Sequence, residues 1–157
     1  MRYDRQMILP EIGEEGQRKL KQAKVLIVGV GGLGSPIALY LAGAGVGCIG
    51  LVDDDVVSIS NLQRQVLYSE KELGKPKAIC AAERLSALNS ETTSQPYPTR
   101  LTEENAQEII SQYDIVVDGC DNFPTRYLIN DICAKTGKVY VLSLIHISEP
   151  TRHLRIS

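Results

Sequence analysis

Short apolar runs alternate along the chain with longer segments in which apolar residues recur at helical spacing. The clearest runs cover residues 25–28, 48–52 and 115–117, and a fourth covers 138–142. Runs of this length without polar interruption are typical of strands that are buried on both faces. Because helical segments separate them, the pattern predicts an α/β domain with a Rossmann-like, open, mainly parallel sheet and helices on both faces.

Helices are predicted from periodicity and end signals at residues 11–22, 35–45, 76–89, 102–110 and 124–137. Pro36 and Pro124 stand in first turns, where proline is tolerated, and Gly45 and Gly137 stand where helices should end. Thr102 is the expected N-cap of its helix.

The helix expected at 76–89 has an apolar residue at every third position, namely Ile79, Ala82, Leu85 and Leu88. We interpret these residues as one buried face. Residues 90–99 are weakly patterned, and no element is predicted there.

No charged residue occurs from position 25 to position 52, a run long enough to span a bilayer on length alone. Eight glycines and Pro36 interrupt this run, and its pattern is strand, turn, helix, strand. We therefore interpret it as a buried parallel unit and not as a membrane span.

The composition is that of one ordinary domain, with 157 residues, 43% hydrophobic and 23% charged. A net charge of -2 argues against a general binder of nucleic acid or membrane surfaces. The four cysteines form no C-x-x-C pair, which argues against a zinc knuckle or a redox motif and favours reduced thiols. No apolar export signal follows Met1, so we expect a cytoplasmic protein.

The stretch from Leu142 through Arg152 resembles the translated adapter sequence of transposon-based sequencing libraries. We therefore place a boundary between an ATP-binding domain, 1–141, and a foreign tail, 142–157. The alternative is a genuine strand with an exposed tail. Both histidines, His146 and His153, lie in this tail, so we give them no catalytic or metal-binding role.

A glycine turn follows the first predicted strand. Gly29, Gly31 and Gly34 fit the pattern G-x-G-x-x-G, and Asp53 follows at the end of the second strand. Gly31 and Gly32 let backbone N–H groups approach phosphate oxygens beside a helix N-terminus. Asp53 can accept hydrogen bonds from ribose hydroxyls. Taken alone, these residues predict a dinucleotide site, although tight strand-to-helix packing explains the glycines equally well.

Three adjacent aspartates, of which Asp55 is a second candidate for nucleotide binding, repel one another unless a cation answers them. The candidate cations are Arg64, Lys77 and Arg5. Arg64 and Lys77 together can hold a triphosphate. Asn61 precedes Arg64 by three residues and adds a neutral donor.

Asp121 follows the third clear strand, at the sheet edge where the glycine turn and Asp53 are expected. A carboxylate there can hold Mg²⁺ against phosphate oxygens, with support from Asn122. Aspartate and asparagine are also common helix caps, so capping is an alternative for both residues.

Residues 2–141 as a whole resemble the ThiF/HesA/MoeB family, the bacterial relatives of ubiquitin-activating enzymes. The matching pieces are residues 2–6, the turn at 29–34, Asp53, and the segments 60–65, 74–77 and 118–122. The resemblance implies an ATP-dependent adenylyltransferase. Such an enzyme activates the C-terminal glycine carboxylate of a ubiquitin-like sulfur-carrier protein as an acyl-adenylate and releases pyrophosphate, in thiamine or molybdenum-cofactor synthesis.

The resemblance also implies a role for each matching residue. It implies nucleotide contacts for Gly32, Asp53, Asn61, Arg64, Lys77 and Asp121. Together with the reasoning from the residues, the nucleotide contacts that we expect are Gly31, Gly32, Gly34, Asp53, Asp55, Ser60, Asn61, Arg64, Lys77, Asp121 and Asn122. Arg64, Lys77, Asp121 and Arg5 are the implied catalytic residues, and Asp121 is the implied Mg²⁺ ligand. Arg5 is implied to reach the site of a second copy, which predicts a homodimer. No nucleic-acid or membrane partner is implied.

The family continues past residue 141 with a carrier-binding surface and two C-x-x-C pairs for structural Zn²⁺, and the chain has no counterpart of these parts. We therefore expect an incomplete enzyme that is inactive by itself and has no zinc site.

Three other functions stay open at this point. A tRNA threonylcarbamoyladenosine dehydratase shares the architecture. An NAD-dependent oxidoreductase explains the glycines and Asp53 but leaves the cations unexplained. A non-catalytic partner subunit would keep the fold for binding only, and the presence of Arg64, Lys77 and Asp121 argues against it.

Overall fold

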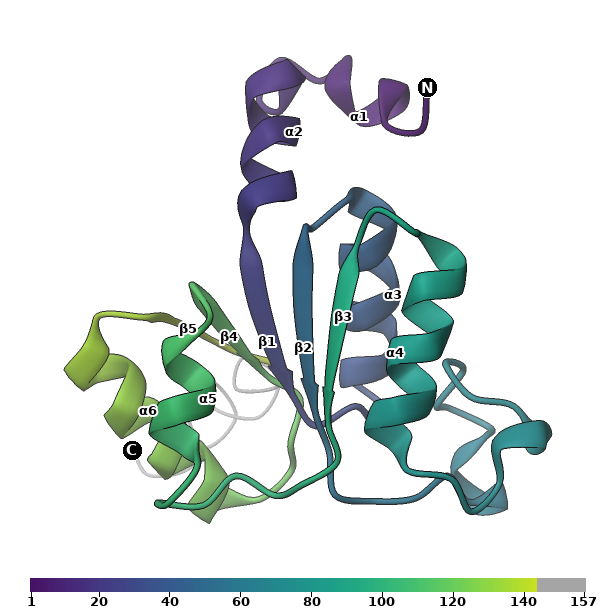
Figure 1. Cartoon of the computed structure of the whole chain (residues 1–157), viewed down its shortest axis with the longest axis vertical. Coiled ribbons are helices and arrows are strands. Elements are labelled where there is room, and N and C mark those ends of the chain that lie inside the picture. The colour runs from purple at the N-terminus through teal and green to yellow at the C-terminus, as the bar shows by residue number, and fades with distance from the viewer. Residues whose placement is uncertain (144–157) are drawn as a thin grey trace, which may run out of the picture.

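The computed structural model describes residues 1–143 (Figure 1). Its elements in chain order are α1 (Asp4–Met7), α2 (Gly13–Gln22), β1 (Lys24–Val28), α3 (Gly34–Ala44), β2 (Cys48–Val52), the short 3-10 helices η1 (Ile59–Asn61) and η2 (Glu70–Glu72), α4 (Lys77–Leu88), β3 (Thr93–Tyr97), α5 (Ala106–Ser111), β4 (Ile115–Asp118), α6 (Phe123–Thr136) and β5 (Val139–Leu142). The predicted tail, 142–157, lies outside the described residues except for its first two positions.

The five strands of the described residues form one sheet in the order β3-β2-β1-β4-β5, and every neighbouring pair is parallel. β1 lies in the middle, with Val28 paired to Val52 on one side and to Asp118 on the other. The chain runs outward from β1 through β2 to β3 and then returns to β4 on the other side of β1, so the strand order reverses between β1 and β4, and open α/β sheets bind ligands at such a point. The predicted fold class is confirmed.

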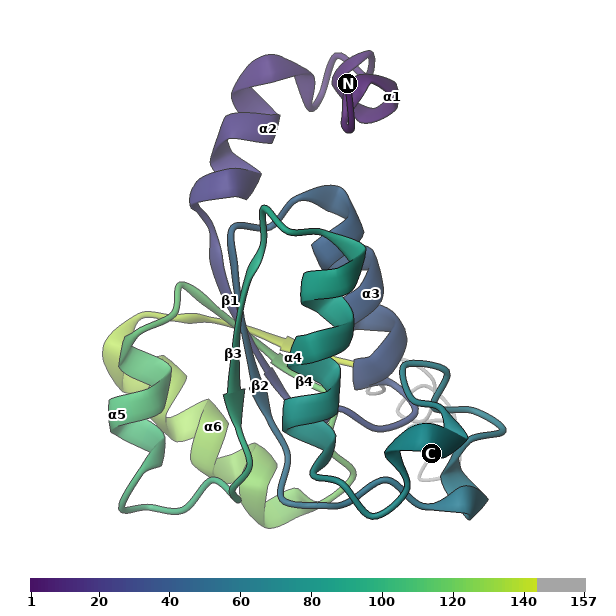
Figure 2. The same cartoon turned by 45° about the vertical axis from the view of Figure 1, so that its right-hand side comes forward.

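Helices cover both faces of this sheet (Figures 1 and 2). Successive residues of a strand point to opposite faces. Val25 and Ile27 accordingly belong to the core beneath α3 and α4, whereas Leu26 and Val28 belong to the core beneath α5 and α6. In both views α1 and α2 lie beyond the amino-terminal ends of the central strands, away from their carboxyl ends.

The charge-free run folds as β1, α3 and β2, as predicted. No helix within residues 1–143 is long and apolar enough to cross a bilayer. The glycine signals are also confirmed, because Gly45 and Gly137 end α3 and α6 in the left-handed conformation with φ of 91° and 67°.

Two predictions for the segment between α4 and α5 were wrong. The weakly patterned segment contains β3, whose residues are exposed or half-buried, so no clear apolar pattern marks it. Pro96 within it also weakens the strand signal, because proline is confined to edge strands. Thr102 is not the N-cap of α5, since that helix begins only at Ala106 after a turn in which Asn105 Oδ1 accepts the Thr102 N–H at 2.9 Å.

The predicted apolar face of α4 was also partly wrong. Ala82 and Leu85 are buried, but Ile79 and Leu88 are exposed. A three-residue step turns a helix by about 300°, so residues at that spacing drift steadily around its surface. The face that packs on the core contains instead Ala78, Cys80 and Ala81.

Candidate functional site

A cleft of about 420 Å³ runs along the carboxyl ends of β1, β2 and β4. Its lining comes from the glycine turn, the three aspartates, the end of η1 and the segment after it, the start of α4, the loop after β3 and the loop after β4. The lining residues are Val28, Gly29, Gly31, Gly32, Leu33, Val52, Asp53, Asp54, Asp55, Asn61, Arg64, Gln65, Lys77, Thr99, Arg100, Leu101, Gly119, Cys120, Asp121, Asn122 and Thr125. Nine of the twelve residues predicted for the site therefore lie in one cleft, and Gly34, Ser60 and Arg5 do not.

The glycines of the turn fall into two groups. A Cβ on Gly34 would lie 1.9 Å from the Gly29 carbonyl oxygen, and a Cβ on Gly29 would lie 2.9 Å from the Cys120 nitrogen. Both glycines are therefore required by packing. The three atoms nearest to a Cβ on Gly32 would all belong to the Arg64 side chain, the nearest at an ordinary 3.5 Å. Packing does not demand Gly32, and its missing side chain leaves room in the cleft for a ligand to approach the backbone.

Three side chains fix the backbone of this turn at Val30. Asp53 Oδ2 accepts the Val30 N–H at 2.8 Å, and the Val30 carbonyl accepts the Tyr68 hydroxyl at 2.7 Å and the Ser35 hydroxyl at 3.3 Å. Burial raises the pKa of the Tyr68 hydroxyl, so this donor keeps its proton. Sequence reasoning missed Tyr68, because nothing local in the sequence connects it to the turn.

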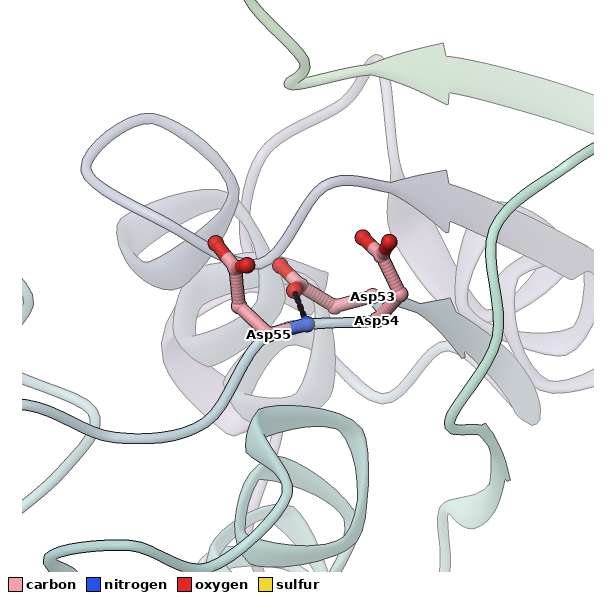
Figure 3. Close-up of side chains that lie close together, drawn as sticks. All are labelled: Asp53, Asp54 and Asp55. Carbon is pink, nitrogen blue, oxygen red and sulfur yellow. Dashed lines mark hydrogen bonds between the residues drawn. The ribbon is translucent and has the colours of Figure 1, made fainter.

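The three aspartates stand side by side after β2 (Figure 3). Asp53 is half-buried, and its second oxygen accepts the Asp55 N–H at 2.9 Å. Burial raises its pKa, although the hydrogen bonds from Val30 and Asp55 and the charge of Lys77 oppose this. Both Asp53 oxygens still have lone pairs with which to accept ribose hydroxyls.

The other two aspartates are each paired with a cation. Lys77 Nζ lies 3.3 Å from Asp55 Oδ2, and Arg100 Nε lies 3.2 Å from Asp54 Oδ2. The three carboxylates approach within 4.8 Å of one another. Lys77 and Arg100 already neutralise two of the three negative charges, so the cluster is not by itself a metal site. Sequence reasoning predicted that a cation lies beside the three carboxylates, but it did not identify Arg100 as one.

Three further predicted residues lie in η1 or shortly after it, with Ser60 and Asn61 in η1 and Arg64 after it. The Arg64 guanidinium lines the cleft, and within residues 1–143 it forms no ion pair; its recorded polar contact is with Gln63 Oε1 at 3.4 Å. Asn61 Oδ1 accepts the Ser58 hydroxyl at 2.8 Å, which leaves its amide N–H groups for the cleft. Ser60 contacts Ser58 at 3.1 Å and lies outside the lining.

Asn122 and Asp121, in the loop after β4, differ in their local contacts. Asn122 is the N-cap of α6, because its Oδ1 accepts the Thr125 N–H at 3.0 Å. The exposed carboxylate of Asp121 has no hydrogen bond or ion pair to any part of the chain that the structure describes. Mg²⁺ prefers carboxylate and phosphate oxygens and keeps several waters. A free carboxylate on the rim of an open cleft fits that preference.

Arg5 is exposed on α1, at the opposite end of the sheet from the cleft (Figures 1 and 2). Tyr3 and Gln6, which lie before and after Arg5 in the chain, are hydrogen-bonded to the rest of the domain. Asn89 Nδ2 donates to the Tyr3 hydroxyl at 2.9 Å, and Gln6 Nε2 donates to the Ala44 carbonyl at 2.7 Å. Arg5 therefore cannot reach the cleft of its own chain.

The sequence model of the ThiF family matches residues 3–146. The chain belongs to this family. The resemblance seen in its motifs is thereby confirmed over nearly all of the chain.

Two curated proteins are similar to this chain over most of its length. A sulfur carrier protein adenylyltransferase from Thermus thermophilus is 55% identical over 145 residues, which make up 92% of this chain and 54% of that protein. The adenylyltransferase and sulfurtransferase MOCS3 from Danio rerio is 53% identical over 141 residues, or 90% of this chain and 31% of that protein. The chain thus spans about half or less of the length of these curated relatives.

Among solved structures, E. coli tRNA N6-threonylcarbamoyladenosine dehydratase, TcdA, in complex with ATP superimposes with a TM-score of 0.84 at 29% identity. The match covers 90% of this chain and 58% of that one. The Rossmann-like ThiF fold is therefore shown by both sequence and structure.

Proposed function

We propose that the cleft binds ATP and that the protein adenylates a carboxylate. One observation carries this proposal: two glycines of the turn, a ribose-type carboxylate, cations that include Arg64 and Lys77, and the exposed Asp121 line the same cleft. The names of the two sequence relatives, which are adenylyltransferases, and the ATP complex of the structural relative support it.

In the proposed reaction a carboxylate oxygen of the substrate attacks the α-phosphorus. A new O–P bond forms, the bond to the β-phosphate oxygen breaks, and pyrophosphate leaves with the electron pair. The attacking carboxylate is already ionised near pH 7, so no general base is needed. The task of the protein is to position the two reactants and to neutralise phosphate charge.

Each cleft residue has a part in this proposal. Backbone N–H groups at Gly31 and Gly32 approach the phosphates at the start of α3, and Asp53 accepts the ribose hydroxyls. Arg64 and Lys77 neutralise the leaving pyrophosphate, with Asn61 as a neutral donor. Mg²⁺, when bound by Asp121 and the phosphates, supplies further charge neutralisation.

The proposed substrate is the C-terminal glycine of a ubiquitin-like sulfur-carrier protein, in thiamine or molybdenum-cofactor synthesis. The name of the Thermus relative supports the carrier. A dehydratase acting on a tRNA nucleoside is the second candidate, and the 0.84 TM-score to TcdA favours it. We rank it second because sequence identity is higher to the adenylyltransferases than to TcdA, 55% against 29%.

We further propose a homodimer in which Arg5 enters the cleft of the second copy. Its exposure and its distance from its own cleft support this arrangement. The four cysteines are free, which supports a reducing compartment such as the cytoplasm.

Exchange of radiolabelled pyrophosphate into ATP tests the proposed reaction, with the protein expressed from its natural reading frame and candidate sulfur carriers added one at a time. We expect exchange that depends on a carrier and its terminal glycine. Asp121→Ala should abolish exchange and leave the unfolding curve unchanged. If no carrier supports exchange and the protein binds NAD tightly, the cleft is a dinucleotide site instead.

A further inference from the structure

Asp118 is a fully buried carboxylate at the end of β4, three residues before Asp121. Its Oδ1 accepts two hydrogen bonds from Cys120, from the backbone N–H at 2.9 Å and from the thiol at 2.7 Å. Its Oδ2 accepts the Tyr140 hydroxyl at 2.6 Å and lies 3.5 Å from Arg126 Nε. One carboxylate thus joins β4, the loop after it, α6 and β5.

Arg126 completes the restraint on Cys120. Its guanidinium donates to the Cys120 carbonyl at 2.8 Å while its Nε faces Asp118. Both backbone polar groups of Cys120 are therefore held by side chains of one ion pair. Because Cys120 directly precedes Asp121, these contacts of Asp118 and Arg126 fix the peptide from which the Asp121 carboxylate projects.

The Cys120 thiol and the Tyr140 hydroxyl, which donate to Asp118, keep their protons over the ordinary pH range. Burial, and next to it the hydrogen bond to Asp118, raises the pKa of the Cys120 thiol to about 12. The same two causes raise the pKa of the Tyr140 hydroxyl. Both groups therefore stay donors, and Cys120 is not a nucleophile in this setting.

A buried carboxylate is costly unless cations and donors surround it, and an aliphatic pair of similar volume would stabilise such a core at least as well. The contacts of Asp118 and Arg126 converge on the loop that carries Asp121, whereas an ion pair that served stability alone would not need to hold both backbone polar groups of Cys120. We propose that Asp118, with Arg126 and Tyr140, is a positioning residue that holds Asp121 in place for the magnesium of bound ATP. This inference rests on the proposed function.

Asp118→Asn tests the inference, because it preserves the size of the side chain but turns one acceptor oxygen into a donor. Asp131→Asn is the matched control, since Asp131 is an exposed aspartate on α6. Two measurements are made on the natural protein and on each variant: amide hydrogen exchange of residues 119–122 without ligand, and ATP affinity with Mg²⁺ or with EDTA.

We expect Asp118→Asn to speed exchange in 119–122 by about tenfold. It should weaken ATP binding by about tenfold with Mg²⁺, as is usual when a supporting contact of a metal ligand is lost, and by less than about twofold in EDTA. Asp131→Asn should change neither. An equal loss of affinity with and without Mg²⁺, or unchanged exchange, overturns the inference.

Tyr140→Phe is the second variant and carries the test should Asp118→Asn fail to fold. It removes one of the donors to Asp118, so the same two shifts should appear at roughly two- to threefold. Tyr127→Phe, at an exposed tyrosine of α6, is its control. If the natural protein binds no ATP at all, the proposed function fails, and hydrogen exchange alone then decides whether Asp118 holds the loop.

Discussion

Lys77 pairs with the acidic part of the cleft and is proposed to contact the phosphates of ATP. It is the first residue of α4 and is only 4% exposed, yet its Nζ reaches Asp55 at 3.3 Å beside the cleft. A long buried stem with its charged end at a cavity wall is how lysine covers apolar surface while keeping its charge available. The pair with Asp55 holds that charge in place before a ligand arrives.

Lys77→Met should weaken the binding of ATP by about ten- to a hundredfold, since it removes a charge-assisted contact to the outer phosphates. AMP, which has no β- or γ-phosphate, should lose much less. Calorimetric titration with both nucleotides measures the difference, and Lys75→Met, at an exposed neighbour, is the control. An equal loss for AMP would place Lys77 near the α-phosphate instead.

The raised pKa of Asp53 predicts how stability depends on pH. Because burial raises this pKa above its ordinary 3.8, the folded protein binds the Asp53 proton more tightly than the unfolded chain does. This contribution to stability is fully present below pH 3.8 and is lost as pH rises through the raised pKa.

We therefore expect the free energy of unfolding of the natural protein, relative to Asp53→Asn, to fall as pH rises from 3.8. Urea unfolding of both proteins at a series of pH values measures this difference. The exposed carboxylate of Asp131, replaced in the same way, corrects for the loss of one negative charge. A difference that does not change with pH would show that the hydrogen bonds from Val30 and Asp55 fully offset burial, and one that rises with pH would show that they outweigh it.

At the scale of elements, α3 contains two glycines with opposite expected effects. Gly34 packs against the Gly29 carbonyl, whereas a Cβ on Gly43 would meet nothing within 4 Å. Gly43→Ala should therefore stabilise the protein by about 0.5–1 kcal/mol through helix propensity. Gly34→Ala should destabilise it by about 1–3 kcal/mol or more. Urea unfolding gives both values, and two changes of the same sign would contradict the packing argument.

The central elements could be predicted from the sequence because burial on both faces makes β1, β2 and β4 continuously apolar. Their parallel arrangement also placed the glycine turn, Asp53 and Asp121 at one edge. β3 could not be predicted, because an edge strand lacks that pattern. Arg100 was missed because its partner Asp54 is 46 residues away, so only the pairing of β2 with β3 brings them together.

At the scale of the whole molecule, the cleft and Arg5 lie at opposite ends of the sheet. If Arg5 serves the cleft of a second copy, Arg5→Ala and Asp121→Ala should each inactivate the dimer for a different reason. Mixing the two variants should restore about a quarter of the natural pyrophosphate exchange, because half of the dimers are mixed and each mixed dimer has one intact site. A control must first verify that the two variants exchange subunits. If activity then does not recover, Arg5 takes no part in the reaction.

Pro96 also has a consequence for how this sheet meets other chains. The Thr93 N–H points inward to the Gly47 carbonyl at 2.9 Å, so the nitrogen at position 96 faces outward. That outer border lacks a donor where an incoming strand would need one, which discourages cross-strand aggregation there. Among residues 1–143, β5 forms the other border with Val139 and Val141 exposed and has no proline, so further strands extend the sheet more readily on the β5 side than on the β3 side.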